Sequence, residues 1–131
     1  MEKIEQLINL AKHNHEIDLK RGEKEFLDLN WALDEIISEV HEVKEEIKKG
    51  NSPYLEDELG DILWGLFMLI AKLEKEEYIT SFDNIFKRSL TKYQERVLSL
   101  NGDSRDNDIW KKVKEKQKLA LEKESKSEKP L

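Results

Sequence analysis

The chain has 131 residues, of which 37% are hydrophobic and 40% are charged, a size that suits one domain with a modest core. Its net charge of −6 argues against a nucleic-acid-binding surface, which usually carries a basic excess, but not against ligands that bind through a divalent cation. The absence of cysteine excludes disulfides, thiol catalysis and zinc–thiolate sites.

The N-terminal segment predicts an amphipathic helix over about 2–19 that ends near Arg21–Gly22. Its apolar residues recur at helical spacing, as in Ile4, Leu7, Ile8 and Ala11. The opening residues are charged and lack the apolar stretch of a signal peptide, so we expect a cytoplasmic protein.

Two longer helices joined by a short turn are expected next. The first is predicted over about 26–49, and the second has Ser52 as its N-cap and Pro53 at its first helical position and runs to about Glu77. The second contains the apolar run 62–71, which is half of the ~20 residues that a membrane span needs. We therefore expect a buried helix and no membrane partner, and the short turn predicts an antiparallel hairpin.

Two more helices are predicted in the last third of the chain. Thr80 and Asp83 form a capping box that opens a helix to about Leu98. A last helix begins near Asn107–Asp108 and frays after about Leu121.

These elements predict an all-α fold, a four-helix-bundle-like core with an additional C-terminal helix. We expect a single domain over 1–121, followed by a charged tail over 122–131 whose low apolar content predicts disorder. The apolar run 62–71 offers more surface than one four-helix packing needs, so we expect an oligomer.

An acidic stripe follows the first helix of the hairpin. Its members are spaced by four, three and four residues and therefore share one helix face: Glu35, Glu39, Glu42 and Glu46. By itself such a stripe is typical of a solvated helix surface.

Glu58 and Asp61 change this interpretation. They share a face at the start of the apolar run, where burying a carboxylate without a partner costs several kcal/mol. The partner is either a bound cation or a lysine or arginine in a buried salt bridge. Because the hairpin brings Glu42 and its neighbour Glu39 opposite this pair, the four carboxylates suit Mg²⁺ or Mn²⁺.

A di-iron bundle is the competing metal site, and it requires Glu-x-x-His motifs. The residues three positions before the histidines are Leu10, Lys12 and Ser38, so no such motif exists. We interpret His41, inside the acidic segment, as a surface residue or a residue behind the ligands.

The segments SEVHEVKEEI and LEDELGDILWGLFMLIA resemble the MazG-type nucleoside triphosphate pyrophosphohydrolases of the all-α NTP pyrophosphatase superfamily. The family hallmark, E-E-x-x-E followed by E-x-x-D, is matched by Glu39, Glu42, Glu58 and Asp61. Ser38 replaces the first glutamate of the hallmark, and Glu35, one turn earlier, is the candidate to take its place. The resemblance continues through KYQERVLSLNGD and IWKKVK and covers roughly 33–118.

The resemblance implies magnesium-dependent hydrolysis of a nucleoside triphosphate between the α and β phosphates, with Mn²⁺ as a substitute, and assembly as a homodimer or homotetramer. Either Glu39 or Glu42 is the expected general base. Lys92 and Arg96 share a helix face and are expected to bind the β and γ phosphates, with Lys114 as a further phosphate contact. Trp110 either stacks on the base or packs in the core.

Two alternatives stay open at this point. One is a sibling activity that uses the same carboxylates, such as a phosphoribosyl-ATP pyrophosphohydrolase or a dUTPase-like enzyme. The other is a non-catalytic helical interaction module whose acidic stripes only keep it soluble.

Overall fold

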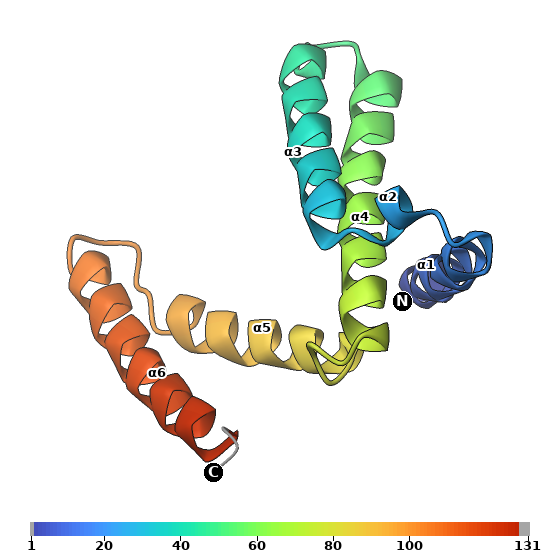
Figure 1. The fold of residues 1–131 in the computed structure, drawn as a ribbon. Coiled ribbons are helices and arrows are strands. Elements are labelled where there is room, and N and C mark those ends of the chain that lie inside the picture. The colour runs from blue at the N-terminus through green and yellow to red at the C-terminus, as the bar shows by residue number, and fades with distance from the viewer. Residues whose placement is uncertain (1, 129–131) are drawn as a thin grey trace. The chain divides into compact units, whose positions relative to one another are not determined.

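The computed structural model describes residues 2–128, which form six helices and no strand (Figure 1). The predicted all-α fold is confirmed. The helices are α1 (Glu2–Arg21), α2 (Lys24–Leu27), α3 (Leu29–Glu46), α4 (Ser52–Lys75), α5 (Phe82–Val97) and α6 (Asp106–Glu128). They form two compact units, which divide between Phe82 and Asp83. The prediction of a single domain over 1–121 stays a prediction.

The first unit is built around α4. Helix α3 runs antiparallel beside it, and α1 packs against its C-terminal half (Figure 1). Gly65 of α4 lies where the hairpin helices approach closely, because a Cβ atom at this position would lie 3.1 Å from Cγ1 of Ile36. The predicted hairpin is therefore present, and a glycine permits its close packing.

The helix predicted over 26–49 is wrong at both of its ends. It is broken at Asp28, whose backbone is extended (φ −76°, ψ 123°) and whose carboxylate accepts a hydrogen bond from the Asn30 amide at 2.9 Å. Aspartate is a strong N-cap, so α3 starts anew after Asp28 and leaves α2 as a single turn. The rings of Phe26 and Trp31 then meet edge to face across this break.

The turn between α3 and α4 is shaped by Asn51. Its side-chain amide donates to the Glu46 carbonyl at 2.9 Å and to the Glu46 carboxylate at 2.7 Å. These bonds satisfy the end of α3, which stops at Glu46 and not at residue 49. Asn51 is also the N-cap of α4, so Ser52 is already helical, one residue earlier than predicted, with Pro53 in the first turn.

A tight connection joins α4 to α5. Glu77 follows α4 in the left-handed backbone region, with φ of 63°. The carboxylate of Glu74 accepts a hydrogen bond from the Phe82 amide at 2.9 Å. The capping box predicted Thr80 as the N-cap and position 81 as the first helical residue, which is wrong by one residue, because α5 begins at Phe82 and Glu74 satisfies its first amide.

The apolar core lies where α4 meets α1, the first turn of α3 and the start of α5. It consists of Ala11, Ala32, Phe67, Met68, Ile70, Ala71 and Phe82. Only the second half of the apolar run 62–71 is buried in this way, since Leu63 and Leu66 are 40% and 42% exposed. Among the residues that the structure describes, no helix combines the length and apolarity that a membrane span requires.

A buried polar trio lies between α1 and α4. The Lys72 ammonium is 3.3 Å from an Asp18 carboxylate oxygen and 3.5 Å from Nδ1 of His15. Lys72 is 1% exposed, His15 2% and Asp18 7%. Burial, and then the charge of Lys72, lower the pKa of His15 below its ordinary value. The trio therefore balances one buried ammonium against one carboxylate and holds a neutral histidine beside them.

Helices α5 and α6 form the second unit, an open hairpin (Figure 1). The predicted disordered tail over 122–131 is helical as far as Glu128, and 129–131 lie outside the described residues. Glutamate and lysine are strong helix formers, and Glu124 pairs with Arg88 of α5, with one N–O distance of 3.3 Å. This ion pair and the local propensity explain why α6 continues past the expected end at Leu121.

Candidate metal and phosphate sites

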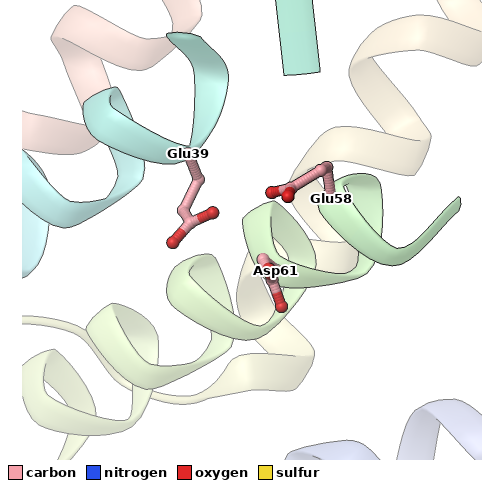
Figure 2. Close-up of side chains that lie close together, drawn as sticks. All are labelled: Glu39, Glu58 and Asp61. Carbon is pink, nitrogen blue, oxygen red and sulfur yellow. The ribbon is translucent and has the colours of Figure 1, made fainter. Parts of the chain in front are cut away.

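Three carboxylates converge across the α3–α4 hairpin. Glu39 of α3 and Glu58 and Asp61 of α4 each offer an oxygen atom, and these atoms lie within 4.8 Å of one another. Figure 2 shows Glu39 and Glu58 pointing toward each other from the two helices. Glu39 and Glu58 are half-buried, and Asp61 is exposed. The group is therefore reachable from solvent at one edge and closed by helix packing at the other.

The hairpin produces this convergence. Glu39 lies about two turns before the end of α3, and Glu58 lies about two turns after the start of α4, so the antiparallel helices bring them to the same height. Asp61 follows Glu58 by three residues and shares its helix face. The short turn capped by Asn51 fixes the register between the two helices.

The carboxylates raise one another's proton affinity. Burial, and then hydrogen bonding to Glu42, raise the pKa of Glu39 to about 7, with smaller contributions from the charges of Glu42, Asp61 and Glu58. Burial and the same hydrogen-bonding neighbour raise the pKa of Glu58. Like charges this close disfavour full ionisation, so the group is short of positive charge at neutral pH.

No ion pair of the described residues supplies this positive charge. Among the described residues, no ion pair includes any of the four predicted carboxylates, which argues against the buried salt bridge considered from the sequence. One oxygen of Glu39 and one of Glu58 are buried without a hydrogen-bond partner. Buried polar atoms are normally satisfied, so these two point to a missing ligand. Hard oxygen donors of this kind fit Mg²⁺ or Mn²⁺.

Comparison with known protein families shows which family the chain belongs to. The MazG nucleotide pyrophosphohydrolase domain matches residues 30–98, which is more than half of the chain. The chain belongs to this family. No curated protein and no solved structure matches the chain significantly. The predicted family is thus confirmed, and the acidic group is a candidate site for the divalent metal that the family generally uses.

The MazG match includes the α3–α4 hairpin except for its first residue, Leu29, and the whole of α5. It covers all four predicted carboxylates together with Lys92 and Arg96, and it ends before Trp110 and Lys114. The last two residues lie on α6, so their predicted roles rest on the shorter motif that follows the matched segment.

The other acidic candidates lie at the margin of the group. Glu42 is exposed and stands outside the three converging residues, although it is close enough to raise the pKa of both Glu39 and Glu58. Glu35 is exposed one turn earlier and is not brought into the group. His41 is exposed on α3 and is likewise outside it, as expected for a surface residue.

The phosphate-binding candidates lie in the second unit, around a groove of about 1470 Å³ between α5 and α6. Lys92, Arg96 and Lys114 all line this groove. Lys92 and Lys114 are exposed, whereas Arg96 is only 8% exposed. The residues that the sequence singled out for phosphate binding therefore share one basic groove.

Trp110 lies beside Arg96. Its ring lies 5.3 Å from the guanidinium carbon of Arg96, and the ring of Tyr93 lies 5.5 Å from the same atom. Trp110 is half-buried, and its contact is a cation–π pair with Arg96. Within the second unit, Trp110 thus helps to hold Arg96.

One residue of this groove was not predicted. Gln117 of α6 accepts a hydrogen bond from Nε of Arg96 at 2.9 Å. Its sequence context, KEKQKLA, reads as a polar helix surface and contains no motif. Only the partner 21 residues earlier in the chain distinguishes Gln117, and a single sequence does not reveal that contact.

Proposed function

We propose that this MazG-family chain hydrolyses a nucleoside triphosphate between the α and β phosphates, in a Mg²⁺-dependent reaction that yields a nucleoside monophosphate and pyrophosphate. The observation that carries the proposal is the convergence of Glu39, Glu58 and Asp61, with two buried carboxylate oxygens that have no partner. A stable helical surface does not require such an arrangement, because it leaves like charges close together without compensation.

In this proposal Glu39, Glu58 and Asp61 hold the cation. When bound, Mg²⁺ neutralises the acidic pocket, polarises the phosphoryl oxygens and lowers the pKa of the attacking water. Glu42 stands beside these residues and raises the pKa of both Glu39 and Glu58, and we assign it the role of orienting them toward the ligand. Mn²⁺ is expected to substitute, because it accepts the same oxygen ligands.

The proton of the attacking water passes to Glu39 or Glu42. The two residues differ in one respect that an experiment can use. Glu39 is one of the three converging residues, whereas Glu42 stands beside them. Of Glu39→Gln and Glu42→Gln, the variant that still binds Mn²⁺ but loses kcat identifies the general base.

We further propose that Lys92, Arg96 and Lys114 bind the phosphates that leave as pyrophosphate. From position 83 onward the chain carries 13 Lys and Arg against 9 Asp and Glu, whereas residues 1–82 carry 10 against 20. A triphosphate bears several negative charges and is attracted to a basic groove. The guanidinium of Arg96 offers a planar fork of donors that matches phosphate oxygens.

A homodimer or homotetramer is also proposed, on the basis of an apolar face of the α3–α4 hairpin. Each helix has an exposed apolar stripe at i, i+4 and i+7: Leu33, Ile37 and Val40 on α3, and Leu59, Leu63 and Leu66 on α4. On each helix, every residue of the stripe comes one position after a residue that faces the other helix. Because the helices are antiparallel, both stripes lie on the same side of the hairpin. A contiguous exposed apolar patch is typical of an interface.

Light scattering at micromolar concentration tests the oligomer, with Leu63→Glu as the disrupting variant. A mass of two or four chains for the wild type, reduced by this substitution, is expected. A monomeric wild-type protein would contradict the proposal.

A substrate panel tests the reaction. The protein is incubated with Mg²⁺ and canonical and damaged NTPs and dNTPs, including dUTP and phosphoribosyl-ATP, and pyrophosphate is assayed. Turnover of one nucleotide class is expected, and its loss in Glu58→Gln but not in Glu56→Gln assigns the site. Glu56 is a matched control because it lies two residues earlier on α4 and is exposed outside the acidic group.

The panel and a metal titration also distinguish a wrong assignment of the metal site from a wrong assignment of the reaction. Turnover that persists in Glu58→Gln removes the metal-site assignment. The absence of turnover for every nucleotide removes the reaction. Calorimetry with Mn²⁺ then distinguishes a metal-binding protein from a helical interaction module, which should release or absorb no binding heat.

A further inference from the structure

Both the oxygen and the nitrogen of the Gln117 side-chain amide form hydrogen bonds. Its oxygen accepts from Nε of Arg96 at 2.9 Å, and its nitrogen donates to the Lys92 carbonyl and to the Glu95 carboxylate, each at 3.0 Å. The one acceptor and both donor hydrogens are therefore engaged, which fixes the orientation of the amide. Gln117 thus connects α6 to both basic residues of the K-x-x-x-R segment and to the glutamate between them.

Arg96 is held from three directions. The rings of Tyr93 and Trp110 lie 5.5 and 5.3 Å from its guanidinium carbon, and Gln117 binds its Nε. Arg96 is only 8% exposed, and it lines the groove between α5 and α6. Its Nε is bonded to Gln117, so a ligand in this groove would be bound through the two Nη groups.

This arrangement suits an arginine that binds an anion. A free arginine side chain loses rotamer entropy when it is ordered, and a side chain that is already ordered does not lose it again on binding. The acceptor is also a neutral amide. A carboxylate in its place would partly cancel the charge of Arg96 and weaken its attraction for phosphate, whereas Gln117 orients the guanidinium and leaves its charge in place.

We propose that Gln117 is a positioning residue that pre-orders Arg96 for the phosphates of the substrate, and that Trp110 acts with it by stacking on the guanidinium. This inference rests on the proposed function, since it requires that Arg96 binds phosphate. Gln117 acts through Nε of Arg96 and has no contact with the substrate.

A double-mutant cycle tests the proposal in the full chain. Gln117→Met removes the hydrogen bonds but keeps side-chain length and helix propensity, and Arg96→Lys removes Nε but keeps the positive charge. KM and kcat are measured with the nucleotide that the panel identifies. We expect Gln117→Met to raise KM about tenfold, the effect of losing one hydrogen bond to a charged group, and to change kcat less than about twofold.

The decisive result is the behaviour in the Arg96→Lys background. If Gln117 acts through Nε, Gln117→Met has no further effect on KM once Arg96 is lysine. Equal effects in both backgrounds would show that Gln117 only packs α6, and the proposal would be overturned. If Arg96→Lys alone leaves KM unchanged, the phosphate-binding role of Arg96 is wrong, and the positioning role is lost with it. Gln94→Met, on the exposed surface of α5, is the control and should match the wild type.

A second measurement does not depend on activity. In ¹⁵N NMR of the protein without nucleotide, the Nε–H signal of Arg96 should exchange slowly with water and should exchange fast in Gln117→Met. Slow exchange in both proteins would contradict the proposal. If Gln117→Met lowers the helix content measured by circular dichroism, Gln117→Ala replaces it in both experiments.

Discussion

Helix α4 carries two clusters of charged side chains, and they differ in how their charge is balanced. Near its start, Glu58 and Asp61 face Glu39 across the hairpin, and none of the three forms an ion pair among the described residues. Near its end, Lys72 is buried against Asp18 and His15. The first cluster is acidic and unbalanced, and the second is compensated by its own partners.

The uncompensated charge of the first cluster is typical of a binding site, whereas the compensated second cluster is typical of a structural ion pair. Breaking a compensated buried pair exposes the remaining charge to a low dielectric and destabilises the fold. Removing one member of an uncompensated group instead relieves repulsion. Substitutions in the two clusters should therefore have opposite effects on stability, and only those in the acidic group should affect activity.

The largest effect is expected from Asp61→Asn. Losing a ligand of the catalytic cation should reduce kcat/KM about 1000-fold, because the cation supplies several kcal/mol of transition-state stabilisation. The melting temperature measured without metal should stay the same or rise. A lower melting temperature together with normal activity would reverse the roles of the two clusters.

The next largest effect is expected from Lys72→Met. Asp18 is then left buried without its partner, which should lower the free energy of unfolding by about 3 kcal/mol in urea titrations. Adding Asp18→Leu should recover most of this loss, since an apolar pair replaces an ion pair at similar volume. A double variant that is less stable than Lys72→Met would show that the pair is not the source of the effect.

A smaller effect is expected from pH in the metal-free protein. Because the pKa of Glu39 rises from 4.5 in the unfolded chain to about 7 in the fold, its contribution to stability is complete below pH 4.5 and is lost as pH rises through 7. Thermal melts without metal should show this decline, and Glu39→Gln should reduce it. Mn²⁺ binding near pH 6 should release a proton, seen by calorimetry in buffers of different ionisation enthalpy, and should release less above pH 8.

The smallest effect is expected from His15. Its pKa in the fold lies below 6.5, so its contribution to stability is complete above pH 6.5 and is lost as pH falls through the pKa of the folded state. Melts at saturating Mg²⁺ between pH 7 and pH 5 should show this loss. His15→Gln should flatten the acid side of the curve, and an unchanged curve would mean that another group titrates there.

Much of the fold was predictable from residue spacing. Apolar periodicity located the long helices, and the Gly50–Pro53 segment located the hairpin turn. The errors arise where a side chain forms a hydrogen bond that starts or ends a helix, which apolar periodicity does not show. Asp28 caps a new helix inside an apparently continuous pattern, and Asn51 ends α3 early by bonding to Glu46.

The candidate site was predictable where the acidic residues on both helices of the hairpin follow a helical spacing. Glu39, Glu58 and Asp61 follow from two spacings and one short turn, and the structure brings their oxygen atoms together. Lys72 gave no such signal, because a lysine at the end of an apolar segment reads as an exposed residue and its partner Asp18 is 54 positions away. Contacts between distant residues are set by tertiary packing, which a single sequence does not display.

The close approach at Gly65 bears on the size of ion that the hairpin can hold. A Cβ atom there would lie 3.1 Å from Ile36, so an alanine would push the helices apart by a few tenths of an ångström. Ligand distances for Mg²⁺ and Ca²⁺ differ by about the same amount, roughly 2.1 against 2.3–2.6 Å. Asp61 lies one turn before Gly65, and Glu39 lies one turn after Ile36. The absence of a side chain at Gly65 therefore helps to determine how far apart the two helices hold the carboxylates that would bind the cation.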